Sequence, residues 1–141
     1  MSLSSMEQKE AVEKISQIIE DLRKQNLNLK EYQAACDVTA KKDFETPKEE
    51  IMCWGLGFAG EAGDVGSCIK KTFAHNNDQK IGIRENIGDA MWYAAMICNF
   101  FEWDMQEILK ENLEKLKARY PAGWSYNDAA RGGTMIDWNK R

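Results

Sequence analysis

Five glycines in a stretch of twelve residues constrain the fold of this chain more than any other feature. The stretch, GLGFAGEAGDVG at residues 55–66, keeps a helical spacing of its other side chains. Each glycine inside a helix costs roughly 0.8–1 kcal/mol relative to alanine, so five cost about 4–5 kcal/mol. That is comparable to the whole stability of a small domain. Close helix–helix contact or a ligand that approaches the backbone must offset this cost.

Acidic side chains occur at helical spacing within this stretch and again after it. Glu61 and Asp64 fall within about 60° of each other around a helix, so both carboxylates point the same way. Asp89 shares a helical face with Glu85 and Asn86. If the two segments pack side by side, three or four oxygen donors converge, and a cation between them relieves the repulsion of like charges. Oxygen donors suit Mg²⁺, and also Mn²⁺.

A solvated helix face is the competing interpretation of these acids, and it is the commoner one for an isolated pair. Two features favour a site. A solvated face gives no reason for the glycines, and an apolar stripe borders the acids: Phe58, Ala62, Val65 and Ile69. The acids therefore lie at the edge of the predicted core rather than in open solvent.

Composition excludes several classes of function. The 141 residues carry a net charge of −4, which argues against a nucleic-acid partner, and no apolar run is long enough to cross a membrane. The first residues show no signal-peptide pattern. The cysteines are widely spaced, which predicts four buried, reduced thiols in a cytoplasmic protein: Cys36, Cys53, Cys68 and Cys98. His75 is the single histidine, which argues against zinc and Ser-His-Asp chemistry.

Helical periodicity predicts an all-α bundle of about five helices. Residues 1–27 form an N-terminal extension with an amphipathic helix over 5–25, residues 28–121 form the main helical domain, and residues 122–141 form an irregular tail. The first helix carries one apolar stripe: Ala11, Val12, Ile15, Ile18, Ile19 and Leu22.

The remaining helices are bounded by capping signals. A helix over 29–41 is followed by one over 47–73, which Thr46 caps, with Pro47 in its first turn and Glu49 closing a capping box. Asp78 caps a helix that reaches residue 101, and Asp104 opens a last helix that ends near residue 120.

The two central helices carry more apolar surface than one small bundle buries. Much of the circumference of the fourth helix is apolar: Ala90, Met91, Ala94, Ala95 and Ile97. Soluble monomers rarely expose such a patch, so we expect a homodimer or homotetramer that pairs through the central helices.

These residues resemble the MazG-like, all-α nucleoside triphosphate pyrophosphohydrolases, whose signature is E-x-x-E on one helix and E-x-x-D on the next. The segment GEAGD at residues 60–64 resembles the first half, and GD at 88–89, followed by MWY at 91–93, resembles the second. Lys70 and Lys71 also match, as do NLEKL at 112–116 and RYP at 119–121. The resemblance covers residues 32–124.

Two departures stand out. Asp64 replaces the usual glutamate with a shorter arm that can still bind a metal. Asn86 stands at the position of the second glutamate and offers a neutral carbonyl oxygen and two N–H donors instead. The loss of one negative ligand weakens metal binding, and Glu85, one turn before Asp89, is placed to compensate; the sequence leaves open whether it does.

The resemblance implies cleavage between the α- and β-phosphates of a nucleotide, with Mg²⁺ as cofactor and a housecleaning or pool-balancing role. It implies Glu61, Asp64 and Asp89 as catalytic metal ligands, joined by Glu85 and Asn86. It also implies residues that contact the nucleotide: Trp54, Lys71, Tyr93, Asn112, Lys115 and Arg119. For these the alternatives of core packing or a solvated face stay open. A nucleotide-binding or partner-binding helical module that has lost turnover is the alternative function, and Asn86 motivates it.

Overall fold

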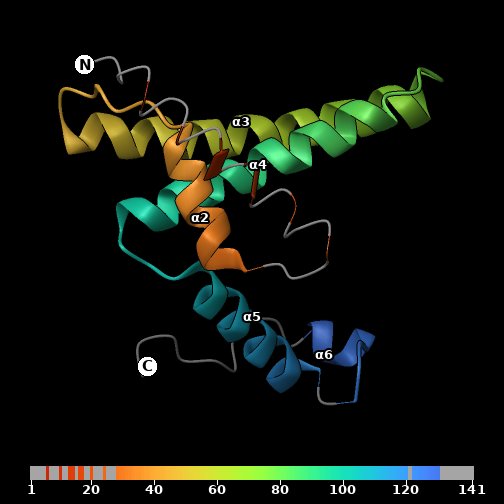
Figure 1. Ribbon diagram of the computed structural model, residues 1–141. Helices are drawn as coiled ribbons and strands as arrows, with labels where there is room; N and C mark the ends of the chain where they lie inside the picture. Colours follow the sequence, from red (N-terminus) through yellow and green to blue (C-terminus); the bar gives the residue numbers. More distant parts are fainter. Residues whose placement is uncertain are drawn as a thin grey trace. The chain divides into compact units, whose positions relative to one another are not determined.

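The computed structural model of the chain describes residues 28–120 and 122–130, together with a few earlier ones: Met6, Glu10, Glu13, Lys14, Ser16, Gln17, Glu20 and Lys24. Over the described residues the chain is helical and contains no β-strand, which confirms the all-α prediction (Figure 1). The elements are α2 (Leu29–Val38), α3 (Pro47–Ala74), α4 (Lys80–Phe100), α5 (Met105–Arg119) and α6 (Tyr126–Ala130). None of the helices described is both long and apolar enough to cross a membrane.

The chain divides into two compact units, residues 1–105 and 106–141, which are described separately. The helix predicted over residues 5–25 falls largely outside the described residues, and so does its whole apolar stripe. Seven of the eight residues described there are helical, and all eight are exposed.

Helix α3 starts where its capping residues predict. Thr46 is the N-cap, its Oγ1 accepts a hydrogen bond from the Glu49 backbone N–H at 3.1 Å, and Pro47 follows in the first turn. The Glu49 carboxylate accepts from the Glu45 N–H at 3.0 Å, one residue earlier than a capping box requires. From this start, α3 continues through all five glycines to Ala74, in agreement with the predicted helix over 47–73.

Helices α2 and α4 differ slightly from the predicted bounds. Helix α2 ends at Val38 rather than at residue 41, because the Thr39 hydroxyl donates to the Cys36 carbonyl at 3.0 Å and accepts from Trp92 Nε1 at 2.9 Å. Gln79, not Asp78, is the N-cap of α4. Asp78 still supports this helix start, since its Oδ1 accepts from the Lys80 N–H at 3.0 Å.

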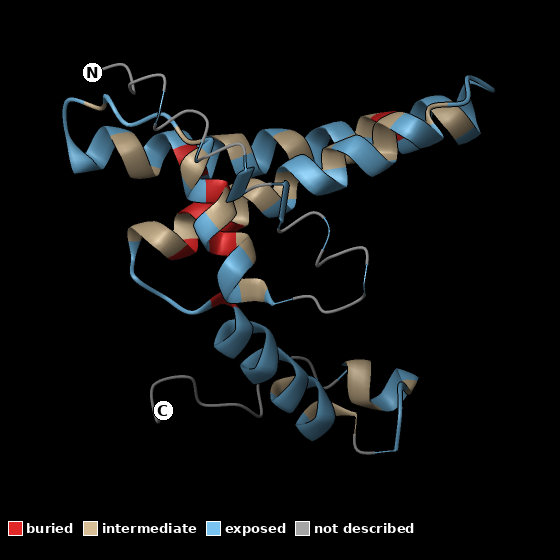
Figure 2. Cartoon of the chain, in the orientation of Figure 1, coloured by how far each residue is buried: buried red, intermediate tan, exposed pale blue. Residues whose placement is uncertain are grey.

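The core of the first unit lies where α2 crosses the pair formed by α3 and α4 (Figure 2). The residues buried there are Cys36, Trp54, Ala95, Met96, Cys98 and Met105. Farther along the α3–α4 pair the side chains are mostly exposed or half-buried, with Cys68 buried between the helices. The prediction of four buried thiols is wrong at Cys53, which is exposed. One helical step turns Cys53 about 100° around α3 from Trp54, which the core buries.

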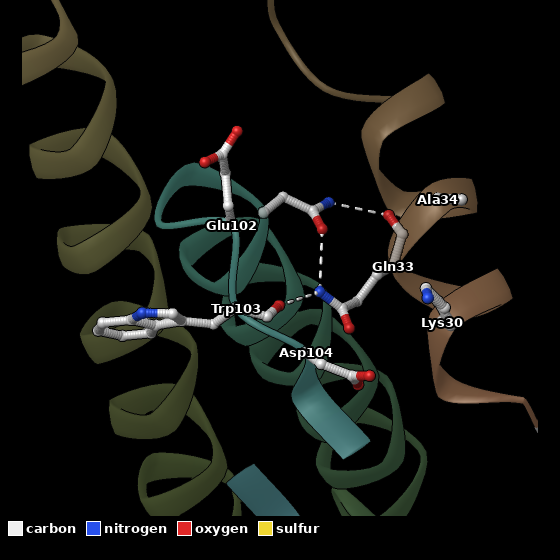
Figure 3. Close-up of a pocket in the computed structure, with 7 residues that line it drawn as sticks. Lys30, Gln33, Ala34, Glu102, Trp103 and Asp104 are labelled. Carbon is white, nitrogen blue, oxygen red and sulfur yellow. Dashed lines mark hydrogen bonds between the residues drawn. The ribbon is translucent and has the colours of Figure 1, made fainter. Parts of the chain in front are cut away.

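A buried glutamine ties α2 to the connection between α4 and α5 (Figure 3). Gln33 Nε2 donates to Asn99 Oδ1 at 3.0 Å and to the Trp103 carbonyl at 2.9 Å. Gln33 Oε1 accepts from the Met105 N–H at 2.8 Å, and Asn99 Nδ2 donates back to the Gln33 carbonyl at 2.9 Å. The network therefore satisfies the Gln33 side chain, which is only 6% exposed.

The second unit contains α5 and a short helix where the sequence predicted an irregular tail over 122–141. Ser125 caps α6, since its hydroxyl accepts from the Asp128 N–H at 3.1 Å and donates to the Asp128 carboxylate at 2.7 Å. This Ser-x-x-Asp pattern satisfies one of the free N–H groups of the first turn. The prediction is therefore wrong over Tyr126–Ala130, and residues 131–141 lie outside the described residues.

Candidate functional site

Helices α3 and α4 lie side by side and antiparallel (Figure 1). Two close contacts set their register. The Tyr93 ring lies against Gly57, where an added Cβ atom would overlap it. Near the other end of the pair, a Cβ added to Gly82 would lie 3.3 Å from Cys68 Sγ. Gly57 and Cys68 are eleven positions apart in the sequence, and so are Gly82 and Tyr93. Between the two contacts, residues that lie equally far from the same contact are therefore opposite each other on α3 and α4, and we call such a pair a level.

This register sets the acidic residues of the two helices opposite one another. Glu61 and Asp89 each lie four residues inward from the Gly57–Tyr93 contact, so they share one level. Asp64 shares the next level with Asn86, which lies four residues inward from Gly82.

The same residues also share the facing sides of the helices. On α3 the positions 57, 61, 64 and 68 fall within about 60° around the axis, because steps of four, three and four residues return to one face. Positions 82, 86, 89 and 93 repeat this spacing on α4. We call these eight positions the seam. The sequence-based expectation that two acidic segments pack side by side is thus met along the chain's own helix pair.

The donors of the seam suit a hard divalent cation by their chemistry. Glu61 and Asn86 are half-buried, whereas Asp64 and Asp89 are exposed, and so is Glu85 on the flank of the seam. Carboxylate and carboxamide oxygens are the ligands that Mg²⁺ and Mn²⁺ accept. In the described part of the chain, however, no three His, Cys, Asp or Glu side chains are close enough to hold one ion. Binding would therefore require side-chain rotation or donors from a second copy.

Asn86, the residue that departs from the expected acid, has a specific partner. Its Nδ2 donates to Cys68 Sγ across the seam at 3.6 Å. Cys68 is one turn beyond Asp64 on α3 and is 9% exposed. Sequence reasoning did not identify Cys68 as part of the site, since its spacing from Asp64 becomes meaningful only with the register of α4.

The two aromatic residues predicted to contact the nucleotide lie in one cluster. Trp54 is 3% exposed, its Nε1 donates to Glu50 Oε1 at 3.2 Å, and its ring packs edge-on against Phe44 and Trp92 with centroids at 5.2 and 5.5 Å. This burial favours core packing over base stacking for Trp54, because no ring face is free. Tyr93 is half-buried at the end of the seam, one level from Glu61 and Asp89.

Tyr32 of α2 is a second residue that sequence reasoning missed. Burial is the main cause that raises the pKa of its phenol, and the negative charges of Cys36 and Asp89 raise this pKa further. Its position in an unremarkable helical pattern gave no signal of this effect.

The other residues predicted to contact the nucleotide are distributed between the two units. Lys71 is exposed in the last turn of α3, beyond the seam. Asn112, Lys115 and Arg119 share one face of α5 by their spacing of three and four residues, and they belong to the second unit. Arg119 Nε is buried and has no hydrogen-bond partner in the part of the chain that the structure describes.

Together, these features define an all-α protein with a carboxylate-lined seam between two antiparallel helices. Residues 55–124, which include the whole seam and α5, match the family model of the MazG nucleotide pyrophosphohydrolase domain. Through this segment the chain belongs to the MazG-like family, a family of pyrophosphohydrolases that generally depend on a divalent metal.

One curated relative is the "Gene 37 protein" of Mycobacterium phage L5. It is 27% identical over 73 residues, which cover 48% of this chain and 64% of that protein. The alignment thus spans less than two thirds of the relative's length. No solved structure matches the chain.

Proposed function

We propose that this protein is a Mg²⁺-dependent nucleotide pyrophosphohydrolase that converts (deoxy)nucleoside triphosphates to monophosphates and pyrophosphate. The observation that carries the proposal is the placement of Glu61 opposite Asp89, one level from Asp64, inside the segment that matches the MazG domain. A cytoplasmic role in cleaning or balancing the nucleotide pool is consistent with this activity.

The metal ligands in this proposal are Glu61, Asp64 and Asp89, with Glu85 and Asn86 as further oxygen donors. A bound Mg²⁺ or Mn²⁺ would neutralise triphosphate charge and favour ionisation of the attacking water. No ion pair within the described residues involves the three carboxylates, and their negative charge favours a cation over the phosphate groups themselves. The nucleotide would then meet the protein through cationic and polar groups.

Several residues are candidates for this second role. Lys71, Lys115 and Arg119 would counter phosphate charge, and Arg119 has an unused Nε–H donor within the described residues. Asn112 lies on the same face of α5 and would hydrogen-bond the ligand. Tyr93 would contact the nucleotide from the end of the seam.

Pyrophosphate release from a panel of nucleotides with Mg²⁺ is the direct test. We expect release from at least one nucleotide, and about a 100-fold or greater loss in Glu61→Gln, because removal of a metal ligand costs at least as much as removal of the groups that orient it. Asp43→Asn is the matched control, since it removes an exposed acid outside the seam. Absence of pyrophosphate with every nucleotide would refute the proposal.

A binding module without turnover is the second candidate function. It is supported by Asn86, a neutral residue at a position where the family signature has an acid. The amide nitrogen of Asn86 donates to Cys68. Asn86→Glu discriminates the two candidates. Metal-dependent hydrolysis that appears only in this variant would favour the module, whereas turnover by the wild-type protein that Glu85→Ala abolishes would identify Glu85 as a compensating ligand.

We also propose that two or four copies pair through α3 and α4. Large apolar side chains on these helices are exposed in the single chain: Met52, Leu56, Phe58, Ile69, Phe73, Ile81, Ile87 and Met91. Among the described residues, the exposed Gly60, Gly63 and Gly66 have no neighbour that a Cβ atom would meet, so they leave room for another backbone. Light scattering at micromolar concentration should give at least twice the 16.2 kDa chain mass. A monomer that hydrolyses nucleotides would refute this pairing.

A further inference from the structure

The contact between Cys68 and Asn86 lies inside the seam, where Asn86 shares its level with Asp64 and Cys68 lies one turn beyond Asp64. The Cys68 sulfur is 9% exposed and accepts from Asn86 Nδ2 at 3.6 Å. Gly82 lies one turn before Asn86 on α4, and a Cβ atom there would lie only 3.3 Å from the same sulfur. The thiol is therefore held between the α4 backbone at Gly82 and the Asn86 carboxamide.

The helix geometry brings these two side chains together. In an α-helix each Cα–Cβ bond tilts toward the N-terminus of its own helix. Because α3 and α4 are antiparallel, the Asn86 side chain tilts toward the level of Cys68, and the Cys68 side chain tilts toward the level of Asp64 and Asn86. The contact thus follows from the register and does not need an unusual backbone.

The hydrogen bond determines which end of the Asn86 carboxamide lies against Cys68. A carboxamide is planar, and its nitrogen and oxygen lie on opposite sides of the terminal carbon. With Nδ2 on Cys68, Oδ1 is directed away from Cys68. No protein donor in the described ranges binds Oδ1, which is the only atom of this side chain that can coordinate a hard cation.

We propose that Cys68 is a positioning residue that orients the Asn86 carboxamide, so that Oδ1 serves as a neutral oxygen ligand beside Glu61, Asp64 and Asp89. This inference rests on the proposed function, because it assigns Asn86 to the same divalent-cation site. It predicts that the thiol acts on the cation only through Asn86. A structural thiol would change stability and leave the cation affinity alone.

Mn²⁺ affinity, measured from the electron paramagnetic resonance signal of the free ion, tests the inference without any turnover. We expect Cys68→Ala and Asn86→Ala each to weaken Mn²⁺ binding about tenfold, in the range found for groups that orient metal ligands. The double variant should bind no more weakly than Asn86→Ala, since Cys68 has nothing left to orient. Cys68→Ser should restore most of the affinity, because a hydroxyl also accepts from Nδ2.

Cys98→Ala is the matched control. It removes a thiol that is similarly buried, at 7% exposed, but outside the seam near the other end of α4, so its Mn²⁺ affinity should equal that of the wild-type protein. Circular dichroism monitors folding of each variant. If Cys68→Ala does not fold, Cys68→Val is compared with Cys68→Ser.

Three outcomes overturn the inference: unchanged Mn²⁺ affinity in Cys68→Ala, additive losses in the double variant, or no Mn²⁺ binding by the wild-type protein. The pyrophosphate assay on the same samples separates the two proposals. Turnover together with an unchanged affinity in Cys68→Ala refutes only the positioning role. Coupled losses of Mn²⁺ affinity without turnover in the wild-type protein refute only the pyrophosphohydrolase.

Discussion

The Tyr93 ring of α4 occupies the space beside Gly57 of α3 that any side chain at residue 57 would need. Of the glycines at 55–66, Gly57 alone has a neighbour within 4 Å of an added Cβ atom among the described residues. Close contact within the chain therefore explains one of the five glycines. That contact also sets the level of Glu61 against Asp89.

Gly57→Ala should destabilise the protein. Alanine gains roughly 1 kcal/mol of helix propensity, but its Cβ overlaps the Tyr93 ring, and such overpacking costs about 1–3 kcal/mol. We expect a lower free energy of unfolding in urea. Gly55→Ala is the matched control, because no described residue lies within 4 Å of its added Cβ, and it should keep or raise stability. Equal stabilisation by both variants would contradict the contact.

Gln33→Leu should cost roughly 2–6 kcal/mol of stability. The Trp103 carbonyl and the Met105 N–H lose their partner, and each buried unpaired group costs about 1–3 kcal/mol. Hydrogen exchange at the Met105 amide should accelerate more than exchange in the middle of α3. Ala34→Ser, at the neighbouring exposed position, is the control and should change little. A neutral Gln33→Leu variant would show that the network does not stabilise the fold.

Alkylation of the folded protein should distinguish one cysteine from the other three. Cys53 is exposed, whereas Cys36, Cys68 and Cys98 are 3%, 9% and 7% exposed. Iodoacetamide at neutral pH should therefore modify Cys53 at least about tenfold faster than the others, as peptide mass spectrometry would measure, because the thiolate must be accessible. In urea all four should react alike. A protected Cys53 in the folded protein would indicate that a second copy covers this face.

Stability should fall at alkaline pH. Burial raises the pKa of the Cys36 and Cys98 thiols above the ordinary value of 9.0, and the Asp104 charge also raises that of Cys98. The folded state then holds these protons more tightly than the unfolded state. The stability that the two protonated thiols contribute is fully present below about pH 9. It is lost as the pH rises through the pKa of the folded state, and the free energy of unfolding falls by up to roughly 1.4 kcal/mol per pH unit for each thiol.

Cys98→Ser tests this linkage because serine does not titrate in that range. The free energy of unfolding, measured between pH 8 and pH 11, should decline less steeply in the variant than in the wild-type protein. Cys53→Ser removes the exposed thiol and serves as the control, with an unchanged slope expected. A Cys98→Ser slope equal to that of the wild-type protein would contradict the prediction.

Local sequence signals predicted most of the helices in this fold. The Thr46 cap and Pro47 gave the start of α3, and apolar periodicity carried the helix through five glycines to Ala74. Bounds failed where a side chain competed for the backbone, as Thr39 does at the end of α2 and Ser125 does in the predicted irregular tail. Such competition depends on contacts that a periodic pattern does not contain, for example the hydrogen bond from Trp92 to Thr39.

The candidate site was likewise predicted from the sequence only in part. The spacing of Glu61, Asp64 and Asp89 placed each acid on a helical face, since that depends only on the 3.6-residue period. Whether Trp54 meets a ligand or the core depends on which elements cover it, and the structure buries its ring among Phe44, Trp92 and Tyr93.

The sequence by itself therefore determined the helical class, the acidic faces and the resemblance to a MazG domain, because helix periodicity and capping are encoded within a few neighbouring residues. Tertiary structure alone decided the register of α3 against α4, which sets Glu61 opposite Asp89 and brings Asn86 to Cys68. The reason is physical: a helix turns its side chains by a fixed angle, but its axial position against a neighbour is set by packing, here by the contacts at Gly57 and Gly82.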